Sequence, residues 1–149
     1  MSNITNIAGN LNLSGLKKKR YTIDDDPNRV LELDTSDMSI LDRVSEAVPS
    51  LIESTKKVSE ISDDATTEQT AEILKETDKI LRDKIDWIFD SNVSEVCAPR
   101  GYMFDIINGE LRFEIILTAI VSLYGENIEQ ETKKLVKRMK SHTDKYTKK

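Results

Sequence analysis

Residues 17–43 read KKKRYTIDDDPNRVLELDTSDMSILDR and contain two short β-type runs, a turn and the start of a helix. Residues 20–23 and 29–33 carry the β-branched, aromatic and alternating apolar side chains that are typical of half-buried strands. Residues 24–28, with the sequence DDDPN, are typical of a turn. The stretch therefore predicts a β-hairpin. Because an isolated two-stranded hairpin is only marginally stable in water, it must pack on helices or pair its edge with a partner.

The sequence after the hairpin predicts two long helices. Residues 34–37 offer N-caps, and the apolar side chains that follow recur at three- and four-residue spacing. Pro49 interrupts this stripe, which predicts a kink or a break into two helices near Val48. The second helix begins at a capping box formed by Thr66 and Gln69.

The second half of the chain predicts further helical segments. The second helix is expected to end around residues 90–92, and residues 93–97 add a short helical turn. Residues 111–124 are apolar nearly all round, which is typical of a helix at the centre of a bundle, and Gly125 predicts its end. A final amphipathic helix is expected from about residue 128. The predicted fold class is mainly α: a small helical bundle with an N-terminal β-hairpin.

Length and composition indicate one domain. The chain has 149 residues, of which 38% are hydrophobic and 33% charged, enough for one modest core. We expect a single helical domain with its hairpin over residues 17–140, a flexible N-terminal arm over residues 1–16 and a basic flexible tail over residues 141–149. The amino end lacks the pattern of a signal peptide, and the single cysteine fits a reducing compartment.

Charge is distributed unevenly along the chain. The net charge is −5, yet residues 17–20 hold four basic residues, and residues 133–149 hold eight basic residues and one acidic residue. Residues 21–132 hold the other 10 basic residues and 26 of the 27 acidic ones, a net charge of −16. This acidic centre favours partners with a basic face and argues against a nucleic-acid-binding core. The basic ends lack the interleaved aromatic residues of a nucleic-acid-binding stripe.

The sequence contains no catalytic or metal-binding pattern. Cys97 has no histidine to activate it, because the only histidine, His142, lies in the lysine-rich tail. The acidic turn resembles the start of a calcium loop, but Arg29 and Thr35 occupy the positions of the required glycine and glutamate. The carboxylates of residues 63–64 have no convergent second group. We therefore predict a non-enzymatic protein that uses no cofactor and no metal.

The order of these parts resembles the tail assembly chaperones of long-tailed phages that infect Gram-positive bacteria, which are small, acidic, mostly helical proteins. The resemblance is carried by RYTI at 20–23, RVLELD at 29–34, DMSILDR at 37–43, FDII at 104–107 and FEIILTAI at 113–120. It implies a non-enzymatic protein of the infected cell's cytoplasm, absent from the mature virion. Such a protein holds the tape-measure protein soluble and helps tail-tube subunits assemble around it.

A protein that holds a long helical chain needs an apolar groove with charged residues around it. We expect the edge of the hairpin and the apolar faces of residues 37–61 and 73–88 to form this groove. The alternative is that these stripes face each other and form the core. No membrane partner is expected, and self-association stays open. The candidate partner-binding residues are Tyr21, Ile23, Val30, Leu31, Leu33, Ile40, Leu41, Val44, Ile73 and Ile80.

Two other classes of protein remain alternatives. A structural virion component, such as a head–tail connector or minor capsid protein, would persist in purified particles. A small acidic regulatory or inhibitor protein would instead bind one partner tightly and stoichiometrically.

The chain ends in Lys148 and Lys149, and consecutive lysine codons can form an A-rich slippery sequence. Because many members of the family that the chain resembles are made in two lengths, we predict a ribosomal frameshift near this end that yields a longer product. The alternative is a lysine-rich end that only increases solubility. Reading the gene tests this: stop codons closing the other frames after Lys149, with no A-rich heptamer nearby, would contradict the prediction.

Overall fold

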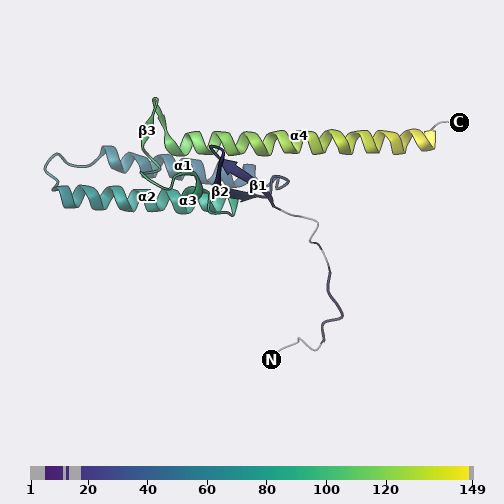
Figure 1. Cartoon of the computed structure of the whole chain (residues 1–149), viewed down its shortest axis with the longest axis horizontal. Helices are drawn as coiled ribbons and strands as arrows, with labels where there is room; N and C mark the ends of the chain where they lie inside the picture. Colours follow the sequence, from purple (N-terminus) through teal and green to yellow (C-terminus); the bar gives the residue numbers. More distant parts are fainter. Residues whose placement is uncertain (1–5, 12, 14–17, 148–149) are drawn as a thin grey trace.

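The structure is a computed structural model that describes residues 6–11, 13 and 18–147. The described chain is mainly helical with an N-terminal β-hairpin, which confirms the predicted fold class (Figure 1). The predicted arm, residues 1–16, lies mostly outside the described residues. The elements are β1 (Lys19–Ile23), β2 (Asp26–Leu33), α1 (Ile40–Ser59), α2 (Thr67–Phe89), α3 (Val93–Cys97), β3 (Ile106–Ile107), β4 (Glu110–Leu111) and α4 (Arg112–Thr147).

The N-terminal hairpin turns at two residues. Asp24 and Asp25 have φ angles of 51° and 58°, the left-handed backbone that a tight two-residue hairpin turn requires at both central positions. The predicted turn over residues 24–28 is therefore too long, because β2 begins at Asp26. The pairing register between β1 and β2 shifts between Thr22 and Ile23. Pro27 is exposed and lies in this irregular part of β2, so its lack of a backbone N–H costs no hydrogen bond between the strands.

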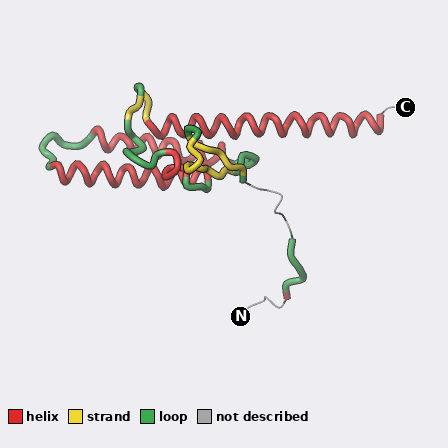
Figure 2. Tube along the Cα trace, in the orientation of Figure 1, coloured by secondary structure: helices red, strands yellow, loops and turns green. Residues whose placement is uncertain are grey.

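Helix α1 runs without a break through Pro49. Of the predicted kink or break near Val48, the break does not occur, because Ala47 and Leu51 are buried on either side of the proline and pack the whole helix along α2. Pro49 itself is exposed. Burial of both flanking turns thus outweighs the lost hydrogen bond, which costs about 3 kcal/mol in a helix interior. Figure 2 shows α1 and α2 as two red tubes that lie side by side.

The ends of α2 are where the local sequence predicts them. The hydroxyl oxygen of Thr66 accepts a hydrogen bond from the Gln69 backbone N–H at 3.1 Å, and the Gln69 side-chain oxygen accepts one from the Thr66 N–H at 2.9 Å. Asp90 ends the helix in the left-handed conformation with φ 48°. The predicted capping box, the end of α2 and the short helix α3 are confirmed.

Helix α4 extends well beyond its predicted end. Asn108 and Gly109 have φ angles of 52° and 82° and form the turn between β3 and β4. Strand β4 is followed directly by α4. The helix then passes through Gly125, where we predicted a stop, and through residue 140, where we predicted the tail. A glycine inside a helix costs about 1 kcal/mol. That cost is too small to end this helix, because Tyr124 is buried beside the glycine.

One apolar core joins the hairpin to all the long helices. The rings of Phe89 in α2 and Tyr124 in α4 lie 5.9 Å apart between centroids, and both side chains are buried. Other large, fully buried side chains are Leu31, Leu33, Ile40, Leu51, Leu81, Ile85, Ile88, Val93, Met103 and Phe113. Helix α4 thus belongs to the core only through its first half.

Arg82 joins α2 to the segment that follows it. Its Nε lies 2.7 Å from a carboxylate oxygen of Asp78, one helical turn earlier. Its remaining nitrogens donate to the backbone oxygens of Ser94, Ala98 and Gly101 at 3.1, 2.9 and 2.9 Å. These carbonyls belong to α3 and the loop after it, which have too few backbone N–H partners of their own. Arg82 therefore satisfies the end of a helix that is too short to be stable alone.

Two more arginines bind helix ends in the same way. Arg29 in β2 donates to the backbone oxygens of Val96 and Cys97 at 3.0 and 3.1 Å, on the other side of α3. Arg43 in α1 donates to the backbone oxygen of Ile88 near the end of α2 at 2.6 Å. Positive charge at a helix C-terminus is favourable because the helix dipole is negative there. These arginines connect the hairpin and α1 to the C-terminal ends of α2 and α3.

We predict that Arg82→Met lowers the free energy of unfolding by about 3 kcal/mol, because it removes the charged partner of the partly buried Asp78 and the donor to the backbone oxygens of Ser94, Ala98 and Gly101. Lys79→Met is the matched control: it also removes a basic partner from an i,i+4 pair in α2, the exposed pair of Lys79 with Asp83. The control should lose less than about 0.5 kcal/mol. Urea unfolding measures both variants, and equal losses would show that the carbonyl contacts contribute nothing.

Candidate partner-binding grooves

The first groove, which we call the hairpin groove, lies where the N-terminal hairpin meets the first half of α4. Its volume is about 340 Å³. Strands β1 and β3, the last residue of α3 and one face of α4 border it, so three separate parts of the sequence converge here. The residues that define it are Ile23, Cys97, Ile107, Ile115, Ile116, Ala119 and Ile120, with the polar side chains of Thr22, Asp24 and Arg112 at its border.

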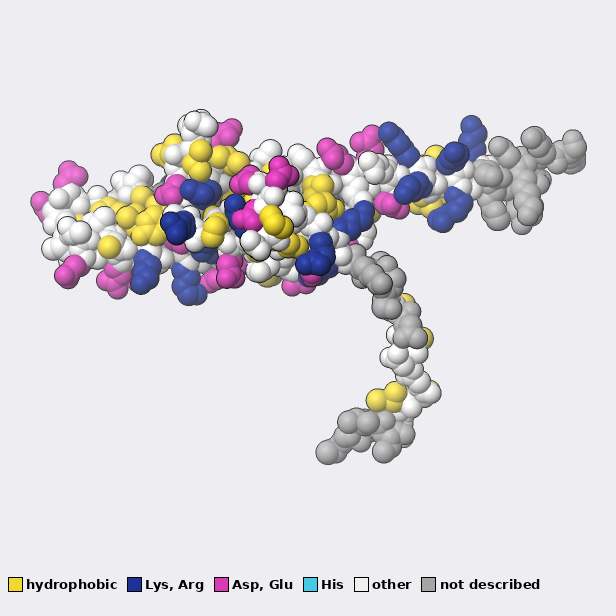
Figure 3. Space-filling view, viewed as in Figure 1, with side chains coloured by type: hydrophobic (Ala, Val, Ile, Leu, Met, Phe, Trp, Pro, Cys, Tyr) yellow, Lys and Arg dark blue, Asp and Glu magenta, His cyan; other side chains and the backbone are white. Residues whose placement is uncertain are grey.

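Large apolar side chains stay exposed at the hairpin groove. Ile115 in α4 is 36% exposed, and Ile106 in β3, next to the lining residue Ile107, is 74% exposed. Figure 3 shows hydrophobic side chains gathered around the β3–β4 hairpin. An exposed apolar cluster of this kind is typical of an interaction surface.

The loop before β3 holds this border of the hairpin groove in place. A side-chain oxygen of Asp105 accepts a hydrogen bond from the Tyr102 N–H at 3.0 Å and lies 3.5 Å from Arg112. Gly101 has a φ angle of 78°, and a Cβ at this position would lie only 2.5 Å from the same carboxylate oxygen. Glycine is therefore required for the tight loop that brings β3 and β4 to the start of α4.

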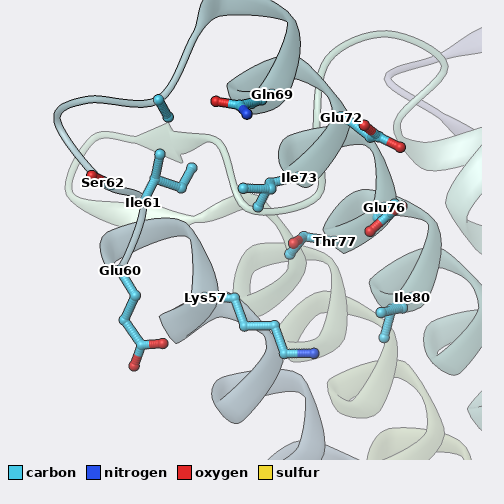
Figure 4. A pocket seen from close by; sticks show the side chains of 11 residues that line it. Lys57, Glu60, Ile61, Ser62, Gln69, Glu72, Ile73, Glu76, Thr77 and Ile80 are labelled. Carbon is cyan, nitrogen blue, oxygen red and sulfur yellow. The ribbon is translucent and has the colours of Figure 1, made fainter.

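The second groove, which we call the interhelix groove, lies between the last turn of α1 and the first half of α2. Its volume is about 630 Å³, and its chemistry differs from that of the hairpin groove because three glutamates line it together with three isoleucines. Figure 4 shows side chains from α1, the connecting loop and α2 around the opening. The residues that define it are Ile61, Ile73 and Ile80 on the floor, with Lys57, Glu60, Glu72 and Glu76 around them.

The structure divides the ten predicted partner-binding residues into three groups. Leu31, Leu33 and Ile40 are at most 1% exposed, so they build the core, which was the alternative for the apolar stripes. Leu41 in α1 is 57% exposed. The other six are half-buried. Of these, Ile23 lines the hairpin groove, Ile73 and Ile80 line the interhelix groove, and Tyr21, Val30 and Val44 line neither.

The predicted set missed the residues that α4 and β3 bring to the hairpin groove. Ile115 and Ala119 were assigned to the bundle interior by their apolar pattern alone, and Ile107 was given no binding role. A signal for them was present, because a helix that is apolar nearly all round must leave one side uncovered unless neighbours surround it completely. The neighbours that cover it are the hairpin and α2, and they leave Ile115 exposed.

Cys97 lies at the bottom of the hairpin groove and is half-buried. Burial raises the pKa of its thiol from 9.0 to about 11, and the nearby Arg29 guanidinium only partly opposes this shift. The thiol is therefore protonated at neutral pH. Among residues 6–11, 13 and 18–147, no group of His, Cys, Asp and Glu side chains is arranged to hold a metal ion.

Comparisons with protein-family models, with curated proteins and with solved structures found no match to this chain. In the described part of the chain, no helix has the length and apolar character needed to cross a membrane. The fold is that of a mainly helical protein with an N-terminal hairpin and two grooves lined partly by apolar side chains.

We predict that iodoacetamide alkylates Cys97 about a hundredfold more slowly in the folded chain than in urea at pH 8, because a pKa raised by two units lowers the thiolate fraction by that factor. The same shift stabilises the fold below pH 9, and this contribution is lost as the pH rises from 9 to 11. Mass spectrometry follows the reaction. Folded and unfolded rates within threefold of each other would mean that the thiol is not desolvated.

Proposed function

We propose that this chain is a non-enzymatic tail assembly chaperone of a long-tailed phage, acting in the cytoplasm of the infected cell. In this proposal it holds a helical segment of the tape-measure protein and assists the assembly of tail-tube subunits around it. The observation that carries the proposal is the hairpin groove, an apolar surface that the protein leaves exposed although it has a core of its own.

The groove has the chemistry to hold an amphipathic helix. Ile23 and Ile107 from two hairpins line it together with Ile115 and Ala119 on α4, so several elements offer apolar contacts to a bound segment. An amphipathic helix recognises such a groove through side chains spaced three and four residues apart. A tape-measure protein presents apolar side chains of that kind along a very long helix, so one client can bind several copies of the chaperone.

The modest exposure of the groove suits a holding function. Burying the remaining surface of a half-exposed isoleucine contributes on the order of 1 kcal/mol. The free energy gained from a few such contacts is only slightly larger than the entropic cost of association, so the complex dissociates readily. A chaperone must release its client when the tail tube replaces it, so weak contacts at many places serve the function better than one tight site.

Co-expression with a tape-measure fragment tests the proposal. The wild-type chain should keep the fragment soluble and co-purify with it, and Ile115→Asp should reduce the recovered complex at least about tenfold, because an unpaired charge enters an apolar contact. Ile52→Asp is the matched control. Ile52 is a 48% exposed isoleucine on α1 that lines neither groove, so its substitution should leave recovery unchanged.

Circular dichroism of both variants shows whether the fold is intact. A fragment that stays insoluble with or without the chain, with no complex in a pull-down, would refute the chaperone function. Recovery of the chain from purified, washed phage particles would instead identify a structural virion component.

A further inference from the structure

The second half of α4 stands apart from the rest of the molecule. Every residue from 129 to 140 is exposed, and Figure 1 shows this part of the helix extending beyond the body. Leu135 and Val136 are 44% and 58% exposed, so apolar surface lies open on this part of the helix. Helices in proteins are stabilised mainly by packing an apolar face, and in the described part of the chain this apolar face stays exposed.

This segment is strongly basic. Residues 133–140 hold five basic and no acidic residues. Lys133 and Lys134 pair with Glu129 and Glu131 about one turn earlier, at 3.1 and 3.4 Å. The residues four positions before Lys137 and Arg138 are themselves basic, and like charges at this spacing repel. Figure 3 shows Lys and Arg side chains gathered on this part of α4. The surface that would stabilise it must therefore be apolar at its centre and acidic around it.

The interhelix groove has this complementary chemistry. Its floor of Ile61, Ile73 and Ile80 is surrounded by Glu60, Glu72 and Glu76, with a single lysine. The wider region, residues 53–76, holds seven acidic and three basic residues. An apolar floor with glutamates around it matches an apolar stripe with lysines and an arginine around it.

The groove and the basic segment of one chain cannot meet. Figure 1 shows the α1–α2 connection at one end of the molecule and the end of α4 at the other, and α4 is continuous between its core half and its basic half. We therefore propose that residues 129–140 of α4 dock into the interhelix groove of a second copy of the chain. Reciprocal docking closes a dimer, whereas docking in one direction builds a longer assembly.

Sedimentation equilibrium of the full-length chain at low salt tests the proposal. The wild-type chain should associate with increasing concentration, and Lys137→Glu/Arg138→Glu or Glu72→Lys/Glu76→Lys should each raise the dissociation constant at least about tenfold. Mixing the two variants should restore association, because the reversed charges are complementary again. Glu46→Lys/Glu95→Lys is the matched control: it reverses two exposed glutamates outside both grooves and should associate like the wild type.

Two results would overturn the proposal. One is a wild-type chain that remains monomeric at about 200 μM and low salt. The other is a mixture of the two charge-reversed variants that associates no better than either alone. Circular dichroism confirms that each variant is folded.

Disulfide trapping identifies the contact itself. In a Cys97→Ser background, one copy carries Leu135→Cys and the other Ile73→Cys, and the two are mixed under mild oxidation. The proposal predicts that the mixed disulfide forms at least about fivefold more than either symmetric one. Exclusive formation of the symmetric Leu135→Cys disulfide would mean that α4 helices pair with each other, and it would contradict docking in the groove.

Discussion

Unpaired backbone carbonyls at the end of a five-residue helix are the constraint on which the rest of this structure depends. Helix α3 is too short to satisfy its own ends, and buried carbonyls without partners are costly. Arg82 from α2 and Arg29 from the hairpin both donate hydrogen bonds to them. Arginine suits this task because its planar group donates several hydrogen bonds in fixed directions. The hairpin, α2 and α3 are thereby held as one unit.

The same contacts position the hairpin groove. Asp78, which pairs with Arg82, also accepts a hydrogen bond from the Met103 N–H at 2.7 Å, and the Met103 carbonyl accepts one from the Phe113 N–H at 2.9 Å. This series of contacts runs from α2 through the loop to the first turn of α4. The apolar face of α4 is therefore presented next to the hairpin. The two grooves lie in different parts of the molecule and differ in charge, so the client helix and the second copy need not compete.

The parts of the fold that were predictable from the sequence are those with local signals. The capping box of Thr66 and Gln69, the hairpin and the short helix after α2 depend on residues a few positions apart. Pro49 and Gly125 are also local signals, yet the helix continues through both positions. Their cost of about 1 to 3 kcal/mol is smaller than the gain from burying apolar side chains nearby, Ala47 and Leu51 around Pro49 and Tyr124 before Gly125. The candidate grooves were predictable only in part, because an apolar stripe looks the same whether it faces the core or a partner.

The sequence by itself determined where most helices begin, where the chain turns, and that acidic residues fill the centre while basic residues gather at the ends. These properties follow from neighbouring residues, so no tertiary contact is needed to predict them. Only the tertiary structure decided that Leu31, Leu33 and Ile40 lie inside while Ile23 and Ile115 border a groove, and that Arg29 binds carbonyls 67 and 68 residues away. It also placed the basic half of α4 and the acidic groove at opposite ends of the molecule. The physical reason is that burial and long-range hydrogen bonds depend on how whole elements pack against each other, and periodicity within one element carries no information about its neighbours.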